Sequence, residues 1–272
     1  MPEVKTDRAL IHYIEMGKGE VTLLFIHGWG INSSYWNDQL EYFSKDYRVI
    51  AIDLPGFGKS NSDRNQWTRQ NYGQDIIDFI DKLSLKNVIL IGHSMSGDVI
   101  LEAALTNHNE IKGIIGIDNF KMLDVSFTPE QMEEITAMSK AIVSDYKNSV
   151  PFFAETLFHP ETPSDVRKRV TADFVNSDEK VALSTLFDMM EYFKILSERL
   201  SALNFKLFLV NSDFGPTNIQ GLEKYCPKSF DVSYIHATGH YPMIEKPEEF
   251  NKILEPVIKK TIVPVQKSCP YS

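Results

Sequence analysis

Short apolar runs alternate with amphipathic segments through the first half of the chain. Residues 47–52, 88–91 and 111–117 are largely apolar, and residues 76–83 carry apolar side chains at helical spacing. Continuous apolar runs are typical of strands that are buried on both faces of a parallel sheet. The pattern therefore predicts an α/β fold, with a mostly parallel central sheet covered by helices on both faces.

The N-terminal segment predicts a local pairing of strands. Residues 8–14 and 21–26 are β-rich, and Gly17-Lys18-Gly19 lies between them. Two such segments joined by a glycine-containing turn are typical of a β-hairpin. We therefore expect residues 8–14 to pair with residues 21–26.

The alternation of strands and helices stops between residues 119 and 203. This segment has the pattern of several helices separated by prolines, from Pro129 to Pro163. Strand and helix patterns resume after it, which is typical of an insertion into one domain. We predict an α/β core made of residues 1–118 and 204–272, with a helical lid insertion at residues 119–203.

Composition and charge limit the classes of function. The chain has 272 residues, of which 43% are hydrophobic, so it can bury one large core. A net charge of -9, without a basic stripe, argues against nucleic-acid binding. The N-terminus lacks the apolar segment of a signal peptide, and no stretch approaches the roughly 20 apolar residues of a membrane span. We expect a soluble, cytoplasmic monomer or homodimer.

The two cysteines do not indicate a disulfide framework or a metal site. Cys226 and Cys269 are too few for such a framework, and neither stands at a metal-binding spacing. We therefore expect reduced thiols, no metal and no organic cofactor.

The apolar run at residues 88–91 leads into the hexapeptide GHSMSG at residues 92–97, with Ser94 between a strand and a helix. An open α/β sheet exposes reactive groups at this position. The pattern Gly-x-Ser-x-Gly relieves crowding in such a tight turn, and here Ser96 stands in place of the last glycine. The functional interpretation is a nucleophilic serine. The structural alternative is a serine in an ordinary turn.

A nucleophilic serine needs a base, and two histidines compete for that role. His240 lies in a loop that follows the predicted strand at residues 230–235, where a base would be required. His236 lies at or near the strand itself, where a side chain is more often structural. We therefore prefer His240.

Four segments together resemble the α/β-hydrolase superfamily, and within it the lid-bearing serine hydrolases of the esterase and lipase type. They are the serine turn, the His240 loop, His27-Gly28-Trp29-Gly30 and the turn DLPGFGKS at residues 53–60. Each motif alone is weak, but their order along the chain is specific.

The resemblance implies roles for individual residues. Ser94 is expected to be the nucleophile and His240 the base, with the backbone N–H groups of Trp29 and Met95 as the oxyanion hole. Gly28 is expected to let its loop approach the substrate closely. The side chains of His27 and Asp53 are interpreted as holding their loops.

The acid of the triad has two candidates. Family members carry an aspartate or glutamate between the serine and the histidine. Asp118 directly follows the predicted strand at residues 111–117, a site that some lid-bearing relatives use. Asp213 follows the strand at residues 205–210, two residues before the position where the family pattern expects the acid. Both remain candidates.

The predicted lid is rich in aromatic side chains. Phe152, Phe153 and Phe187 belong to an apolar set at helical spacing, and the default interpretation is packing of the lid on the sheet. Because an insertion at this point would cover Ser94, we also predict that these three contribute to substrate binding.

These observations predict a carboxylesterase-like serine hydrolase that acts on a small, largely apolar ester through an acyl-enzyme. A carbon–carbon bond, lactone or thioester hydrolase or an acyltransferase could use the same triad. The alternative from another class is a ligand-binding or receptor protein with vestigial hydrolase activity. A serine at the turn argues against chemistry that requires a carboxylate nucleophile.

Overall fold

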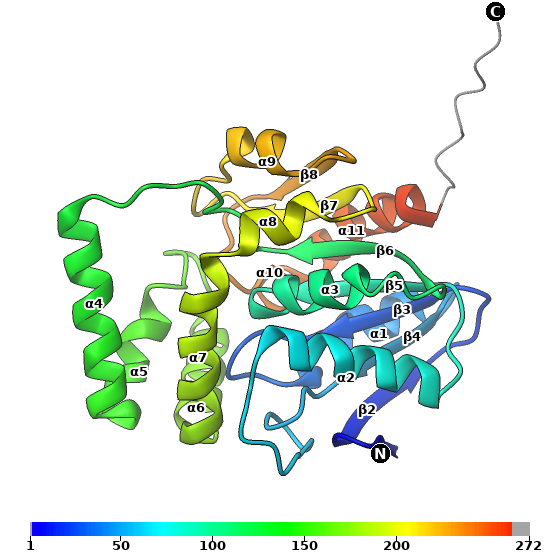
Figure 1. The fold of residues 1–272 in the computed structure, drawn as a ribbon, viewed down its shortest axis with the longest axis horizontal. Helices are drawn as coiled ribbons and strands as arrows, with labels where there is room; N and C mark the ends of the chain where they lie inside the picture. Colours follow the sequence, from blue (N-terminus) through cyan, green and yellow to red (C-terminus); the bar gives the residue numbers. More distant parts are fainter. Residues whose placement is uncertain (1, 263–272) are drawn as a thin grey trace, which may run out of the picture.

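The computed structural model describes residues 2–262, which form an eight-stranded sheet in the order β1-β2-β4-β3-β5-β6-β7-β8 (Figure 1). The strands are β1 (Glu3–Lys5), β2 (Leu10–Met16), β3 (Thr22–Ile26), β4 (Arg48–Ile52), β5 (Val88–His93), β6 (Ile111–Ile117), β7 (Leu207–Ser212) and β8 (Phe230–Ile235). All pairs from β4 to β8 are parallel, and β1 and β2 join antiparallel at one edge. The predicted α/β fold with a mostly parallel sheet is confirmed.

The predicted N-terminal hairpin is wrong, although both of its strands form. β2 pairs antiparallel with β4, with Tyr13 opposite Ile52, and it does not pair with β3. Both edges of β3 are occupied by parallel partners, β4 on one side and β5 on the other. Since a strand has only two hydrogen-bonding edges, β2 must take the outer edge of β4.

Side chains on the strands alternate between two apolar layers. On β3, Leu24 and Ile26 belong to one buried cluster, whereas Leu23 and Phe25 belong to the other. This alternation follows from the period of two of a β-strand, and it explains why β3 is apolar throughout.

Helices cover both layers. The helices outside the long insertion are η1 (Ser33–Trp36), α1 (Asn37–Phe43), α2 (Arg69–Lys82), α3 (Met95–Leu105), α9 (Ile219–Tyr225), α10 (Pro242–Glu245) and α11 (Pro247–Ile262). α2 and α3 pack together on the near face of the sheet in Figure 1, and α1 and α11 pack together on the far face. The helix at Pro247 begins where the sequence predicts it.

Five helices lie between β6 and β7. They are α4 (Pro129–Ser144), α5 (Tyr146–Glu155), α6 (Ser164–Asn176), α7 (Glu179–Phe193) and α8 (Leu196–Ser201), and we call them the inserted helices. They fall within the helical segment that the sequence predicts. Figure 1 shows α4 to α7 beside the edge at which the parallel strands end.

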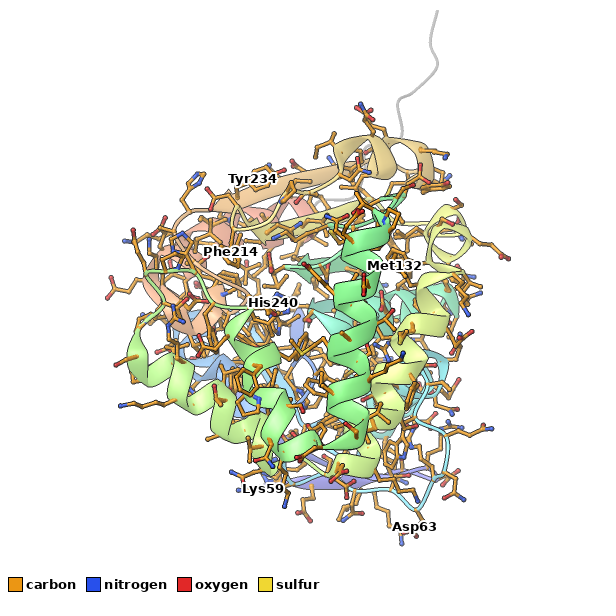
Figure 2. All side chains as sticks on the ribbon, turned by 90° about the vertical axis from the view of Figure 1, so that its left-hand side faces the viewer. Lys59, Asp63, Met132, Phe214, Tyr234 and His240 are labelled. Carbon is orange, nitrogen blue, oxygen red and sulfur yellow. The ribbon has the colours of Figure 1, made fainter. Side chains whose placement is uncertain are left out.

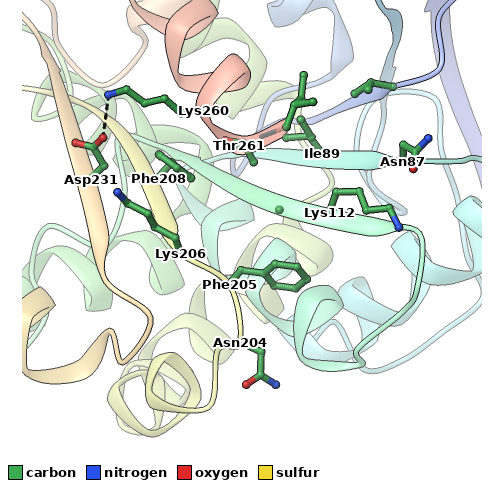
Figure 3. Close-up of a pocket in the computed structure, with 13 residues that line it drawn as sticks. Asn87, Ile89, Lys112, Asn204, Phe205, Lys206, Phe208, Asp231, Lys260 and Thr261 are labelled. Atoms are coloured by element: carbon green, nitrogen blue, oxygen red, sulfur yellow. Dashed lines mark hydrogen bonds and ion pairs between the residues drawn. The ribbon is translucent and has the colours of Figure 1, made fainter. Parts of the chain in front are cut away.

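A large hollow lies at the opposite end of the parallel strands, where these strands begin (Figure 3). It measures about 920 Å³ and is lined by residues at the amino ends of β5 to β8, among them Ile89, Lys112 and Phe208. An ion pair of 3.0 Å between Lys260 and Asp231 borders it. Because Ser94 follows the carboxyl end of β5, this hollow is separate from the predicted catalytic site.

The sequence makes one prediction about membrane spans and another about cysteines, and the structure bears on each. Within residues 2–262, no helix combines the length and the apolar character that crossing a bilayer requires. Cys226 is buried with a free thiol, while Cys269 lies outside the described residues.

Candidate active site

Ser94 occupies the sharp turn between β5 and α3, as the sequence predicts. Its backbone has φ 53° and ψ -119°, an unusual conformation for a residue with a side chain. A Cβ at Gly92 would collide with the carbonyl of Ser96. A small residue two positions before the serine is therefore a steric requirement of the turn.

Ser96, which replaces the glycine of the motif, is fully buried and bonded. Its hydroxyl donates a hydrogen bond to the backbone carbonyl of His27. The extra hydroxyl thus ties the serine turn to the loop at residues 27–30.

His240 lies between Ser94 and Asp118 and bonds to both. Its Nε2 is 2.7 Å from Ser94 Oγ, and its Nδ1 is 2.6 Å from Asp118 Oδ2. Asp118 follows β6 directly, and the loop of His240 follows β8. Figure 2, turned so that the inserted helices face the viewer, labels His240 near the middle of that face.

Asp118 has three hydrogen-bond donors around its carboxylate. Besides His240, Oδ1 accepts from Lys121 Nζ and from the backbone N–H of Ser212, each at 2.9 Å. Burial alone would raise the pKa of Asp118, but the hydrogen bond and charge of His240 and the charge of Lys121 outweigh burial. The pKa of this carboxyl therefore lies well below its usual range, and the group is ionised at neutral pH.

Asp213, the other candidate acid, has a different partner. Its Oδ2 is 2.6 Å from His236 Nδ1, and both side chains are exposed. The structure thus brings Asp118, and not Asp213, to His240. The two aspartate–histidine pairs are separate.

Buried groups hold the backbone on both sides of His240. His93 Nε2 bonds to the carbonyl of His240 at 2.7 Å, and burial lowers the pKa of His93 to about 3, which keeps its ring neutral. Glu245 accepts hydrogen bonds from the backbone N–H groups of Gly239 and Tyr241, at 2.8 and 2.9 Å. Glu245 is not predicted from the sequence, where its only signal is its place in the first turn after Pro242.

The loop at residues 27–30 is fixed by its own histidine. His27 Nε2 accepts a hydrogen bond from the backbone N–H of Leu54 at 2.9 Å, and Nδ1 bonds to the carbonyl of Gly28 at 2.7 Å. A Cβ at Gly28 would lie 2.6 Å from His93 Nδ1 and 3.2 Å from Ser94 Cβ. Glycine therefore allows this loop to rest against the serine turn.

Asp53 holds the neighbouring turn. Its carboxylate accepts hydrogen bonds from the backbone N–H groups of Ser33 and Lys59, at 2.7 and 2.8 Å. It also contacts His12 Nδ1 at 3.1 Å. These contacts agree with the structural interpretation of this aspartate.

A cavity of about 220 Å³ opens at Ser94. Its lining is mainly apolar and includes Trp29, Met95, Phe153, Phe174, Leu186 and Met189, together with Ser94 and His240. Of the three predicted substrate-binding phenylalanines, Phe153 lines the cavity. Phe152 and Phe187 do not, and they are 70% and 50% exposed. Neighbours on a helix point about 100° apart, so Phe152 cannot face the same side as Phe153.

One charged residue that the sequence does not predict as part of the site also lines this cavity. Arg69, the first residue of α2, is only 1% exposed. An arginine at the start of a helix gives no sequence signal of burial, because the inserted helices that cover it are remote in the chain. Within the described residues, no group of three or more histidine, cysteine, aspartate or glutamate side chains is placed to hold a metal ion.

Comparison with known proteins agrees with the fold and the motifs. A family model described as "alpha/beta hydrolase fold" matches residues 21–206. The chain belongs to the α/β-hydrolase fold family. The predicted resemblance is thus confirmed. A thermophilic esterase from Thermogutta terrifontis has the same fold, with a TM-score of 0.78 and 21% identity over 97% of this chain and 100% of that chain.

The curated proteins to which the chain is similar include two hydrolases and a receptor. A karrikin insensitive 2 receptor IA from Petunia hybrida is 24% identical over 89% of this chain and 91% of its own length. A pimeloyl-[acyl-carrier protein] methyl ester esterase from Wigglesworthia glossinidia brevipalpis is 24% identical over 90% and 96%. An (E)-2-((N-methylformamido)methylene)succinate hydrolase from Acinetobacter baylyi is 39% identical, but over 37% of this chain and 38% of that protein.

Proposed function

We propose that this protein is a serine hydrolase that cleaves a carboxylic ester of a small, largely apolar substrate through an acyl-enzyme intermediate. The observation that carries the proposal is the pair of hydrogen bonds that runs from Ser94 through His240 to Asp118. A serine hydroxyl becomes an effective nucleophile when a base takes its proton and a third group orients that base.

The reaction proceeds in two halves. Ser94 Oγ attacks the ester carbonyl carbon while its proton passes to His240 Nε2, and the alcohol leaves with that proton as its C–O bond breaks. His240 then takes a proton from water, whose oxygen attacks the acyl carbon. The bond to Ser94 Oγ breaks as the proton returns to Oγ. Asp118 stays ionised and stabilises the imidazolium throughout.

The tetrahedral intermediates require N–H donors for their negatively charged oxygen. We assign this role to the backbone N–H groups of Trp29 and Met95, two residues that line the cavity at Ser94. The close approach of Gly28 to the serine turn supports the assignment, since it keeps the Trp29 loop beside the nucleophile.

The cavity supports a small and mostly apolar acyl group. Its volume of about 220 Å³ and its apolar lining suit a short chain. For this hydrolysis, we propose that the inserted helices form a lid that shields the acyl-enzyme from competing nucleophiles. Phe153 would then contact the substrate.

The relatives support ester cleavage. The esterase from Wigglesworthia matches nearly the whole chain, and the Acinetobacter protein is also a hydrolase. The Petunia relative is a receptor, so ligand binding with vestigial turnover is the rival function. Lactone, thioester and carbon–carbon bond hydrolysis, and acyl transfer, require a wider substrate panel, because all of them can use the same three side chains.

Turnover of p-nitrophenyl acetate and butyrate tests the proposal, with Ser94→Ala as the matched control. We expect wild-type turnover and a loss of about 10⁴-fold or more in kcat in the variant. Labelling of wild type, but not of Ser94→Ala, by a fluorophosphonate should accompany it. Wild-type turnover no faster than that of the variant would favour the receptor function.

A further inference from the structure

We propose that Arg69 forms a carboxylate-binding subsite in the cavity of Ser94, so that the preferred substrate is a half-ester of a short dicarboxylic acid. This inference rests on the proposed ester hydrolysis and changes one end of its substrate, because the acyl chain stays apolar but ends in a carboxylate. The acyl chain would lie along the apolar wall, with its ester at Ser94 and its free carboxylate at Arg69.

Arg69 is a buried cation at the wall of the cavity that holds Ser94. Its side chain is almost wholly buried, yet it lines the same cavity as Ser94 and His240. Most of the remaining lining is apolar, and a buried guanidinium retains its charge at any physiological pH. A cation in such a place is costly unless its N–H groups find acceptors.

The hydrogen bonds of Arg69 leave one N–H group of the guanidinium without an acceptor. Nη1 donates to the carbonyl of Thr185 at 2.6 Å and to Asp188 Oδ2 at 2.9 Å. Nε has no hydrogen-bond partner within residues 2–262, and the nearest acidic oxygen, Asp98 Oδ2, is 3.7 Å away. A buried donor without an acceptor favours a ligand that supplies one. The planar fork of a guanidinium matches a carboxylate best.

The surrounding charges determine when an anion can enter. Asp188 on α7 already pairs with Arg69, and on α3 Glu102 pairs with Arg199 at 2.6 Å. Asp98 on α3 lies 3.7 Å from Arg69 Nε, an ion pair too long for a hydrogen bond, and burial raises the pKa of its carboxyl to about 7 against the charge of Arg69. Below pH 7 Asp98 is therefore mostly neutral and does not compete with an anionic ligand for Arg69. Above pH 7 its charge competes with that ligand.

The experiment compares two esters of equal shape. Monomethyl succinate ends in a carboxylate, and methyl 4-methylpentanoate carries an isopropyl group in its place. At pH 6 we expect wild type to show at least a tenfold higher kcat/KM for monomethyl succinate, measured as methanol release. Arg69→Met should lose this preference, and the wild-type preference should shrink between pH 6 and pH 8. Equal kcat/KM for the two esters in wild type would overturn the subsite.

A second variant separates ligand binding from the structural role of Arg69, which also anchors α7. Asp188→Asn removes the same ion pair but keeps the guanidinium, so it should retain or strengthen the preference for monomethyl succinate. Loss of the preference in Asp188→Asn, to the level of Arg69→Met, would assign the effect to α7 and overturn the subsite. If Arg69→Met does not fold, Arg69→Lys takes its place, with a reduced preference expected and an unchanged one contradicting the proposal.

Different results would refute the carboxylate-binding subsite and the proposed ester hydrolysis. Ser94-dependent turnover of the neutral ester without any preference for the half-ester would refute the subsite alone. Absence of Ser94-dependent turnover of every ester would refute the proposed hydrolysis. Calorimetric titration of Ser94→Ala with succinate then tests the subsite by itself, with binding at pH 6 expected, and absence of heat overturning it.

Discussion

Lys121 places a positive charge on the far side of the Asp118 carboxylate from His240. Its Nζ bonds to Asp118 Oδ1 and to the carbonyl of Ser212, both at 2.9 Å. Lys121 therefore fixes Oδ1 of Asp118, while Oδ2 faces His240.

Lys121→Met is expected to lower kcat by about tenfold, because the carboxylate of Asp118 loses the ion pair that holds it against His240. Steady-state kinetics on a p-nitrophenyl ester measures the loss. Lys224→Met is the control, as Lys224 pairs with the exposed Asp124. An unchanged kcat in Lys121→Met would contradict this role.

Asp118 and Asp213 can be distinguished by one substitution each. Asp118→Asn should lower kcat by about 10⁴-fold, because an amide favours the wrong tautomer of His240. Asp213→Asn should leave kcat within about twofold, since Asp213 bonds to the exposed His236. Steady-state kinetics on a p-nitrophenyl ester measures both. Equal, mild losses would mean that neither residue is the acid of the triad.

At the scale of elements, polar contacts join α7 to the core. The indole N–H of Trp29 donates to the carbonyl of Ala182 at 3.0 Å and to Thr185 Oγ1 at 3.1 Å. The ring itself packs against Phe153 and Phe174. The residue that follows Gly28 therefore links the predicted oxyanion loop to the inserted helices.

Trp29→Phe keeps an aromatic ring but removes the donor, so α7 should open more readily. One net hydrogen bond is worth about 1 kcal/mol, which corresponds to roughly five- to tenfold faster amide exchange. Hydrogen exchange followed by mass spectrometry should show this effect in residues 179–193, with α11 unchanged as the internal control. Equal exchange of residues 179–193 in both proteins would show that this contact does not hold α7.

The sequence predicts which helices and strands form more reliably than it predicts how they pair and pack. β2 and β3 are visible as β-rich segments, but their partners depend on β4 and β5, which follow later in the chain. The helical insertion is likewise evident from its prolines. Which aromatic side chains face the cavity depends on the rotation of α5 and α7, and a helical pattern alone does not determine that rotation.

At the scale of the molecule, the site is assembled from distant segments that share one edge of the sheet. Ser94, Asp118 and His240 follow β5, β6 and β8, so the strand pattern alone places them together. The same rule also brings Asp213 to this edge, because β7 is the neighbour of β6. Sequence reasoning could therefore narrow the acid to two residues but could not choose between them, since the choice depends on which histidine each carboxylate meets.

The partly buried carboxyl of Asp98 should make the stability of the whole protein depend on pH. Its pKa is raised to about 7, whereas an aspartate in an unfolded chain titrates near pH 4. Between these values the folded protein holds a proton that the unfolded chain has released. The contribution of Asp98 to the free energy of unfolding therefore falls as the pH rises toward 7.

His27 and His93 act in the opposite direction, because burial lowers their pKa, and the unfolded chain binds protons below about pH 6.5 that the folded protein excludes. Comparison of wild type with Asp98→Asn cancels their effect, since both proteins contain these histidines. From urea denaturation, we expect the free energy of unfolding of wild type minus that of the variant to decrease by about 2 kcal/mol between pH 5 and pH 7. A difference that stays constant over this range would show that Asp98 is already ionised in the folded protein at pH 5. The Asp98 carboxylate would then compete with an anionic ligand for Arg69 at pH 5 as well.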